Sequence, residues 1–164
     1  MNSQVSKSRI PASRSSSKKK SASSADACNA FDVDVADLRG IVEAVRKTQP
    51  LLERSVDGSV LSANEPFLGL TGLTAPAIKN KEPEELLAEG GMKRAEIAGF
   101  WERVLDGELT SCDIGYAKAD GQTLWSASRF TVIRDAKGKP RKIVELLSDI
   151  SDRKALESEI EELR

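Results

Sequence analysis

Residues 111–150 read SCDIGYAKADGQTLWSASRFTVIRDAKGKPRKIVELLSDI, and this stretch determines the architecture of the chain. Apolar and polar side chains alternate through three runs, which indicates β-strands near 112–116, 123–133 and 142–147. Asp120-Gly121 separates the first two runs, and a turn from Asp135 to Gly138, followed by Pro140, separates the second pair. Tight turns between successive strands predict an antiparallel meander.

The residues before this meander predict the rest of one domain. Apolar residues at helical spacing over 38–45 indicate an amphipathic helix, and two apolar runs around Asp57-Gly58 indicate a β-hairpin. Residues 65–100 predict short helices, and a stripe over 97–105 predicts one further helix. The order of elements predicts an α+β domain, in which helices cover one face of a five-stranded antiparallel sheet.

The composition excludes most catalytic chemistry. The chain has 164 residues and no His, which excludes His-based acid–base catalysis, Ser-His-Asp triads and Cys-His pairs. Its two cysteines are too few for an all-cysteine tetrahedral metal site, so we predict no metal. The carboxylates lie on predicted helix surfaces and do not converge as a pair, so we predict that the protein is not an enzyme.

The charge is unevenly distributed along the chain. The net charge of −1 gives no overall reason to expect a nucleic-acid or membrane partner. The first 25 residues nevertheless hold six Lys or Arg, ten Ser and no acidic residue. This composition predicts a disordered basic leader over 1–30, which either solubilises the protein or contacts nucleic acid or acidic lipid. No apolar run approaches the roughly 18 residues of a membrane span, and we predict a cytoplasmic protein.

Short motifs follow one another in an order and spacing that resemble a PAS domain. They are Asp57-Gly58, Ala63-Asn64, Thr71-Gly72, Phe100-Trp101-Glu102-Arg103, Asp120-Gly121, Trp125 and Asp149-Ile150-Ser151-Asp152-Arg153-Lys154. The last resembles the "D-I-T-x-R-K" exit of PAS domains, with Ser151 where Thr is usual. The phrase around Phe100 and the strand around Trp125 are most similar to PAS modules of methyl-accepting chemotaxis receptors.

The resemblance divides the chain and implies its role. We expect an N-terminal amphipathic helix over 31–47, the PAS domain over 48–150, and the start of a C-terminal signalling helix over 151–164. Leu156, Ile160 and Leu163 are spaced as in a coiled-coil seam, which stops mid-pattern at Arg164. This predicts either a longer chain or a truncated signalling helix. Asp149, Ile150, Ser151 and Arg153 would transmit the signal into that helix.

The resemblance also suggests four residues for a ligand cavity. Trp125 lies where related haem- or flavin-binding domains use a Trp to line the cavity, although a Trp in the core or on the sheet surface is the more common case. Asn64 is expected to cap the helix that follows it. Arg54 is either an inward-facing cation, paired with a carboxylate or a ligand anion, or a solvated charge. Tyr116 offers one hydrogen-bond donor or is plain core.

Departures from the family pattern restrict the cofactor. Some chemoreceptor relatives ligate haem through a His before the Phe-Trp helix, where this chain reads Ile78-Lys79-Asn80-Lys81-Glu82-Pro83. The absence of His therefore excludes His-ligated haem and leaves flavin, another small molecule or no cofactor. Neither Cys28 nor Cys112 matches the reactive Asn-Cys-Arg cysteine of light-sensing relatives.

Two functions are compatible with these residues. The first is a sensory signal-transduction module, the input domain of a cytoplasmic chemoreceptor-type or other signalling protein, which passes ligand or redox state through its exit helix. The second is a ligand-free module for protein interaction or dimerisation. Both predict a homodimer through the N- and C-terminal helices, with a signalling protein as a further partner.

Overall fold

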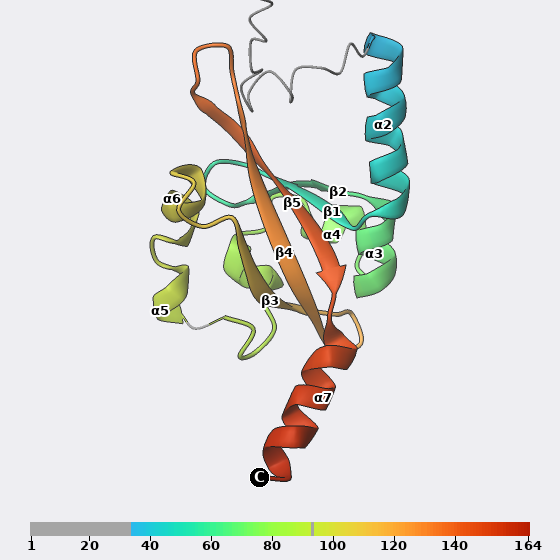
Figure 1. The fold of residues 1–164 in the computed structure, drawn as a ribbon, viewed down its shortest axis with the longest axis vertical. Helices are drawn as coiled ribbons and strands as arrows, with labels where there is room; N and C mark the ends of the chain where they lie inside the picture. Colours follow the sequence, from blue (N-terminus) through green and yellow to red (C-terminus); the bar gives the residue numbers. More distant parts are fainter. Residues whose placement is uncertain (1–33, 93) are drawn as a thin grey trace, which may run out of the picture. The chain divides into compact units, whose positions relative to one another are not determined.

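The structure, a computed structural model, describes residues 34–92 and 94–164, so the predicted basic leader lies outside the described residues. Its centre is the predicted five-stranded antiparallel sheet, with strand order β2-β1-β5-β4-β3 (Figure 1). The strands are β1 (Leu51–Arg54), β2 (Val60–Ala63), β3 (Ser111–Ala117), β4 (Thr123–Arg134) and β5 (Pro140–Asp149). The predicted hairpin and meander are therefore confirmed, with strand ends moved by a few residues.

The helices pack against one face of the sheet, as predicted. They are α3 (Glu65–Thr71), α4 (Ala75–Ile78), the 3₁₀ helix η1 (Pro83–Leu86), α5 (Arg94–Ile97) and α6 (Phe100–Leu105). Phe67, Ile78 and Phe100 from these helices form one core with strand residues such as Ile114 and Leu147. Two further helices, α2 (Val35–Thr48) and α7 (Ser151–Glu162), flank the domain in sequence and bury none of their residues.

The stripe over 97–105 does not form a single helix, which corrects the prediction. Gly99 adopts a left-handed backbone conformation, with φ of +72°, and so separates α5 from α6. Glycine adopts this conformation without the steric cost that a Cβ imposes. Phe100 and Val104, which follow this break, still bury their side chains on the sheet.

Both edges of the sheet are closed by backbone from the connecting segments. Val60 of β2 donates to the carbonyl of Lys81 and accepts from the amide of Asn80. On the other edge, Gly115 of β3 accepts from Ala88 and donates to the carbonyl of Gly91. Closed edges leave fewer free backbone groups for pairing with another chain. Within the described residues, no helix has the length and hydrophobicity needed to cross a bilayer.

Asn64 holds together three elements at one corner of the sheet. Its Oδ1 accepts from the amide of Leu51 at 2.9 Å and from the amide of Phe67 at 3.2 Å. Its Nδ2 donates to the carbonyls of Arg46 at 2.8 Å and Gln49 at 2.6 Å. The predicted cap of the following helix, α3, is thus confirmed, and the same side chain also fixes the end of α2 and the start of β1.

Replacing Asn64 with Ala is expected to lower the free energy of unfolding by about 2 kcal/mol, because it removes a helix cap and leaves the buried Leu51 amide without its acceptor. Urea denaturation of both proteins measures the difference. Asn64→Asp retains the two acceptor bonds but places a carboxylate oxygen against the carbonyls of Arg46 and Gln49, so it should also be less stable than the parent. Equal stability of the Ala variant and the parent would contradict this role.

Candidate functional site

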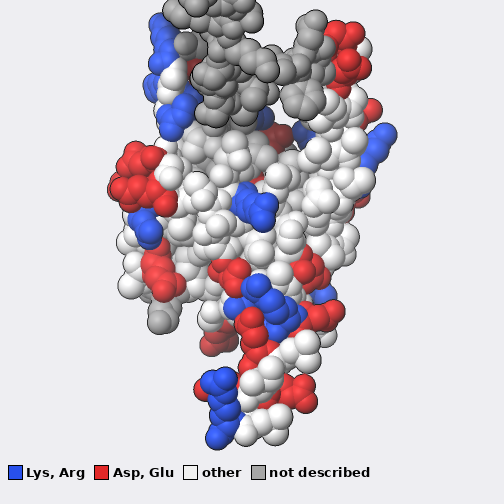
Figure 2. All heavy atoms as spheres, viewed as in Figure 1, with Lys and Arg blue, Asp and Glu red and all other residues white. Residues whose placement is uncertain are grey.

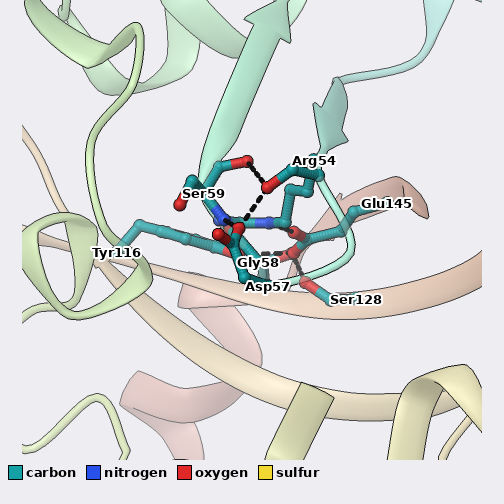
Figure 3. A network of polar contacts seen from close by, with 9 residues as sticks. Arg54, Asp57, Gly58, Ser59, Tyr116, Ser128 and Glu145 are labelled. Atoms are coloured by element: carbon teal, nitrogen blue, oxygen red, sulfur yellow. Dashed lines mark hydrogen bonds and ion pairs between the residues drawn. The ribbon is translucent and has the colours of Figure 1, made fainter. Parts of the chain in front are cut away.

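A buried polar network lies on the helix-covered face of the sheet. Arg54 of β1 donates through Nε to Glu145 of β5 at 2.7 Å, and through one terminal nitrogen to the hydroxyl of Tyr116 on β3 at 2.9 Å. The Tyr116 hydroxyl donates to the other carboxylate oxygen of Glu145 at 2.5 Å. Figure 3 shows the three side chains converging from three strands. Each is at most 2% exposed, so the network is a closed polar cluster within the core.

Strand alternation brings these groups to one face. In β1, Leu52 and Arg54 point inward, and in β5 Glu145 lies between the inward-facing Ile143 and Leu147. Glu145 is paired in register with Leu52 of β1. Since Arg54 is two residues further along β1, its long side chain reaches the carboxylate diagonally across the strand pair. Of the alternatives for Arg54, the structure has the inward-facing cation with a carboxylate partner.

The turn between β1 and β2 completes the coordination of Arg54. The remaining terminal nitrogen donates to the carbonyl of Gly58 at 2.9 Å. The turn itself is fixed by Asp57, whose carboxylate accepts from the Ser59 amide at 3.0 Å and from the Ser55 hydroxyl. A buried guanidinium needs hydrogen-bond partners, and here each of its three nitrogens has one: a carboxylate, a phenol and a backbone carbonyl.

The Arg54 guanidinium keeps its charge, and the Tyr116 phenol keeps its proton. Burial alone would lower the pKa of the Arg54 guanidinium, but Tyr116 and Glu145 beside it raise that pKa above its ordinary value. Burial and the neighbouring Glu145 raise the pKa of the Tyr116 phenol well above its usual range. Tyr116 therefore keeps its proton at neutral pH and acts as a donor to the carboxylate.

Trp101 of α6 covers the network. The guanidinium carbon of Arg54 lies 5.1 Å from the centre of the indole ring, a cation–π distance. The ring also stacks on Gly58, where a Cβ would come within 2.2 Å of it, and φ of Gly58 is +93°. The indole Nε1 is buried and has no hydrogen-bond partner. Glycine is thus required at 58 both by the backbone and by the indole.

A small cavity remains beneath Trp101. It is lined by Arg54, Tyr116 and apolar side chains that include Met92, Phe100 and Ile114, and its volume is about 10 Å³. This is about the smallest space that holds a single water molecule. Sites for small-molecule ligands are typically about 300–1,000 Å³. This cavity therefore does not fit a flavin, because its volume is far below that of a small-molecule site.

The four suggested cavity residues separate into two groups. Arg54 and Tyr116 line the cavity and touch each other, whereas Asn64 lies at the α2–β1–α3 corner. Trp125 is not among the lining residues, because it alternates with the inward-facing Leu124 and Ser126 and so points to the opposite face of the sheet. There, Lys154 of α7 lies 5.6 Å from its ring centre.

The exit segment joins the sheet to α7. The amide of Ile150 donates to the carbonyl of Trp125 at 2.8 Å, and the Ser151 hydroxyl accepts from the Trp125 amide at 3.1 Å. Asp149 accepts from the amide of Ser151, the first residue of α7, at 2.9 Å. Arg153 and Lys154 form ion pairs with Asp113 of β3 at 2.9 and 3.1 Å. All four suggested transmission residues therefore lie at one junction between β3, β4 and α7.

The Cys112 thiol and the acidic residues are the other groups whose chemistry bears on a site. Burial raises the pKa of the Cys112 thiol to about 12, with Glu145 and Asp113 adding to the effect, so the thiol stays protonated. Cys28 lies outside the described residues. Across 34–92 and 94–164, no group of three or more Cys, Asp or Glu residues is arranged to hold a metal ion.

Sequence reasoning did not identify Glu145, Gly58 or Trp101 as parts of this site. The signal for Glu145 was present, because a charged residue lies between two inward-facing apolar positions, Ile143 and Leu147. Trp101 was assigned to core packing by its helical stripe, and Gly58 only to a turn. Their contact depends on how α6 packs over the turn between β1 and β2, which strand or helix periodicity does not encode.

Comparison with known proteins gives the same fold. A family model described as the PAS fold matches residues 48–155. The biofilm dispersion protein BdlA of Pseudomonas aeruginosa is 26% identical over 117 residues, which cover 71% of this chain and 28% of BdlA. The chain thus spans less than a third of that relative.

Three solved structures share the fold at low identity. An RNA-binding light-oxygen-voltage receptor superposes with a TM-score of 0.66 at 21% identity, covering 81% of this chain and 39% of the receptor. The light state of the Aureochrome1 LOV domain superposes with a TM-score of 0.57 at 22% identity, covering 76% of this chain and 99% of that domain. The PAS domain of the fruit-fly ELK potassium channel superposes with a TM-score of 0.56 at 16% identity, covering 70% of this chain and 97% of that domain.

Glu145→Leu is expected to lower the free energy of unfolding by about 3–5 kcal/mol, because it leaves the guanidinium of Arg54 buried without a counter-charge. The double variant Arg54→Met with Glu145→Leu removes both charges and should be more stable than the single variant. Thermal and urea denaturation of the three proteins measure the order. A double variant no more stable than Glu145→Leu would show that the charge pairing is not the source of the loss.

Proposed function

We propose that this chain, which belongs to the PAS family of sensory domains, is the input domain of a cytoplasmic chemoreceptor-type or related signalling protein. Its role is to pass a change in the sheet to the exit helix, without catalysing a reaction. One observation carries the proposal: side chains and backbone of 149–154 bind α7 directly to β3 and β4. A shift of either strand therefore acts on the first turn of the helix.

The path from the inner face to α7 is short. Tyr116, at the centre of the buried network, lies on β3 three residues from Asp113, the ion-pair partner of the exit helix. Tyr116 also pairs in register with Leu124, the neighbour of Trp125. A change in the Arg54–Glu145–Tyr116 network would therefore move the strands that hold the start of α7. If these strands have two arrangements, a signal can act by favouring one of them.

The dimer proposed for this domain uses α2 and α7. Both helices carry apolar residues at helical spacing that are half exposed or more; these are Val35, Leu38, Ile41 and Val42 on α2, and Leu156, Ile160 and Leu163 on α7. A two-fold pair of such helices buries both stripes against their own copies. The seam on α7 is about one heptad, so α2 would supply the greater part of the interface.

A ligand-free interaction module is the second candidate, and the size of the cavity favours it. The cavity beneath Trp101 has a volume of about 10 Å³, which supports a domain whose described core packs without a ligand there. In this case the input is contact with a signalling protein, and the network around Arg54 serves to hold the strands in place.

Absorption spectroscopy and thermal denaturation of the full chain with added FMN or FAD distinguish the two candidates. We expect a colourless protein whose melting temperature moves with neither flavin, because the cavity has no room for the ring system. A stabilised protein with flavin absorption would mean that the inner face rearranges around a ligand. That result would favour the cofactor-sensing form of the function over the ligand-free form.

Asp113→Asn is expected to loosen the exit helix, because it removes the ion pairs to Arg153 and Lys154. Amide hydrogen exchange over residues 150–156 should accelerate, while exchange in the core strands stays unchanged. Asp120→Asn makes the same charge change at the exposed pair with Lys118 and serves as the matched control. Transmission through this junction is contradicted if the two variants leave the exchange of α7 equally unchanged.

A further inference from the structure

The hairpin of β4 and β5 extends beyond the strands beside it. β3 pairs with β4 only as far as Arg129, and β1 pairs with β5 only as far as Ile143. Beyond these positions the two strands continue as a two-stranded ribbon to the turn at 135–139 (Figure 1). Ile133 and Arg134 of β4 and residues 140–142 of β5 pair only with each other, which corresponds to roughly 7–10 Å of projection before the turn. We call residues 129–141 the basic arm.

The basic arm holds most of the unpaired positive charge that the structure describes. Among Lys and Arg residues whose side chains are described, seven form no ion pair with a carboxylate. Five of them lie on the arm, and all five are exposed: Arg129, Arg134, Lys137, Lys139 and Arg141. The other two, Arg39 and Lys79, are on separate elements. Figure 2 shows Lys and Arg side chains gathered at the upper left, over the end of this hairpin.

The arm's own contacts do not neutralise these charges. Arg134 donates to the carbonyls of Gly138 at 3.1 Å and Leu105 at 2.7 Å, which are uncharged acceptors. Asp135 is the single acidic residue of the arm, and its carboxylate accepts from the amides of Lys137 and Lys139 within the turn. Elsewhere, by contrast, Lys118, Arg153 and Lys154 each meet a carboxylate. The arm is therefore a local concentration of positive charge on a chain with a net charge of −1.

Screening separates the arm from the acidic remainder of the domain. At physiological ionic strength the Debye length is about 8 Å, which is comparable with the projection of the arm. A ligand at the tip therefore experiences the arm's cations more than the more distant carboxylates. The net charge gave no reason to expect a nucleic-acid partner. It is a sum over the whole chain, however, and does not describe the electrostatic potential at the tip of the arm.

The shape and composition of the arm select the kind of polyanion. Its turn, Asp135-Ala136-Lys137-Gly138-Lys139, has no large apolar side chain that could insert into a lipid layer. A two-stranded ribbon fits the major groove of B-form DNA, which is about 12 Å wide. We propose that the basic arm binds double-stranded DNA through its phosphate backbone. The contacts are phosphate contacts from Lys and Arg, so the binding is independent of sequence.

The test measures fluorescence anisotropy of a labelled 20-base-pair DNA duplex at increasing salt. Every protein is the full chain with its six leader cations replaced by Gln, so that the leader does not dominate binding. The arm variant carries Lys137→Gln, Lys139→Gln and Arg141→Gln. The matched control carries Arg39→Gln, Lys47→Gln and Lys79→Gln, three exposed cations outside the arm. Circular dichroism verifies that each protein folds.

We expect the parent to bind, and the arm variant to bind at least tenfold more weakly while the control changes by less than twofold. The slope of log affinity against log salt should become shallower by about 3 in the arm variant, because three phosphate contacts are lost. Absence of binding by the parent, or equal losses in both variants, would overturn the proposal. Tighter binding to phosphatidylserine vesicles or to polyglutamate than to the duplex would overturn it as well.

Discussion

The buried ion pair between Arg54 and Glu145 is the constraint on which the inner face depends. It joins β1 to β5, and the Tyr116 hydroxyl extends it to β3, so three strands share one set of satisfied donors and acceptors. Desolvation makes such a cluster costly unless every member is bonded. The carbonyl of Gly58 accepts from Arg54, and the indole of Trp101 covers its guanidinium. Only a small cavity remains beneath that indole.

The same strands connect the inner face to the surface. Residues that alternate along β3 and β4 put Tyr116 on the inside, and Asp113 and Trp125 on the side of α7. The two faces of the sheet are therefore linked, because the strands that pack in the core on one face also contact α7 on the other.

Periodicity and turn chemistry were sufficient to predict the sheet, because each strand alternates and each turn has its Gly. They failed where backbone conformation or tertiary contact overrides a pattern. Gly99 breaks an otherwise continuous stripe, and Trp125 falls on the outer face, which parity alone does not assign. The partner of Arg54 depends on strand order, since Glu145 is 91 residues away along the chain. Asn64 was predicted correctly as a cap because capping is local.

The two tryptophans of the chain lie on opposite faces of the sheet. Trp101 is stacked on Gly58 beside a buried guanidinium, and Trp125 lies under an ammonium group at the start of α7. Each indole thus has a different electrostatic environment. The protein consequently contains two intrinsic fluorophores, one for the interior and one for the exit helix, whose emission can be separated by replacing either with Phe.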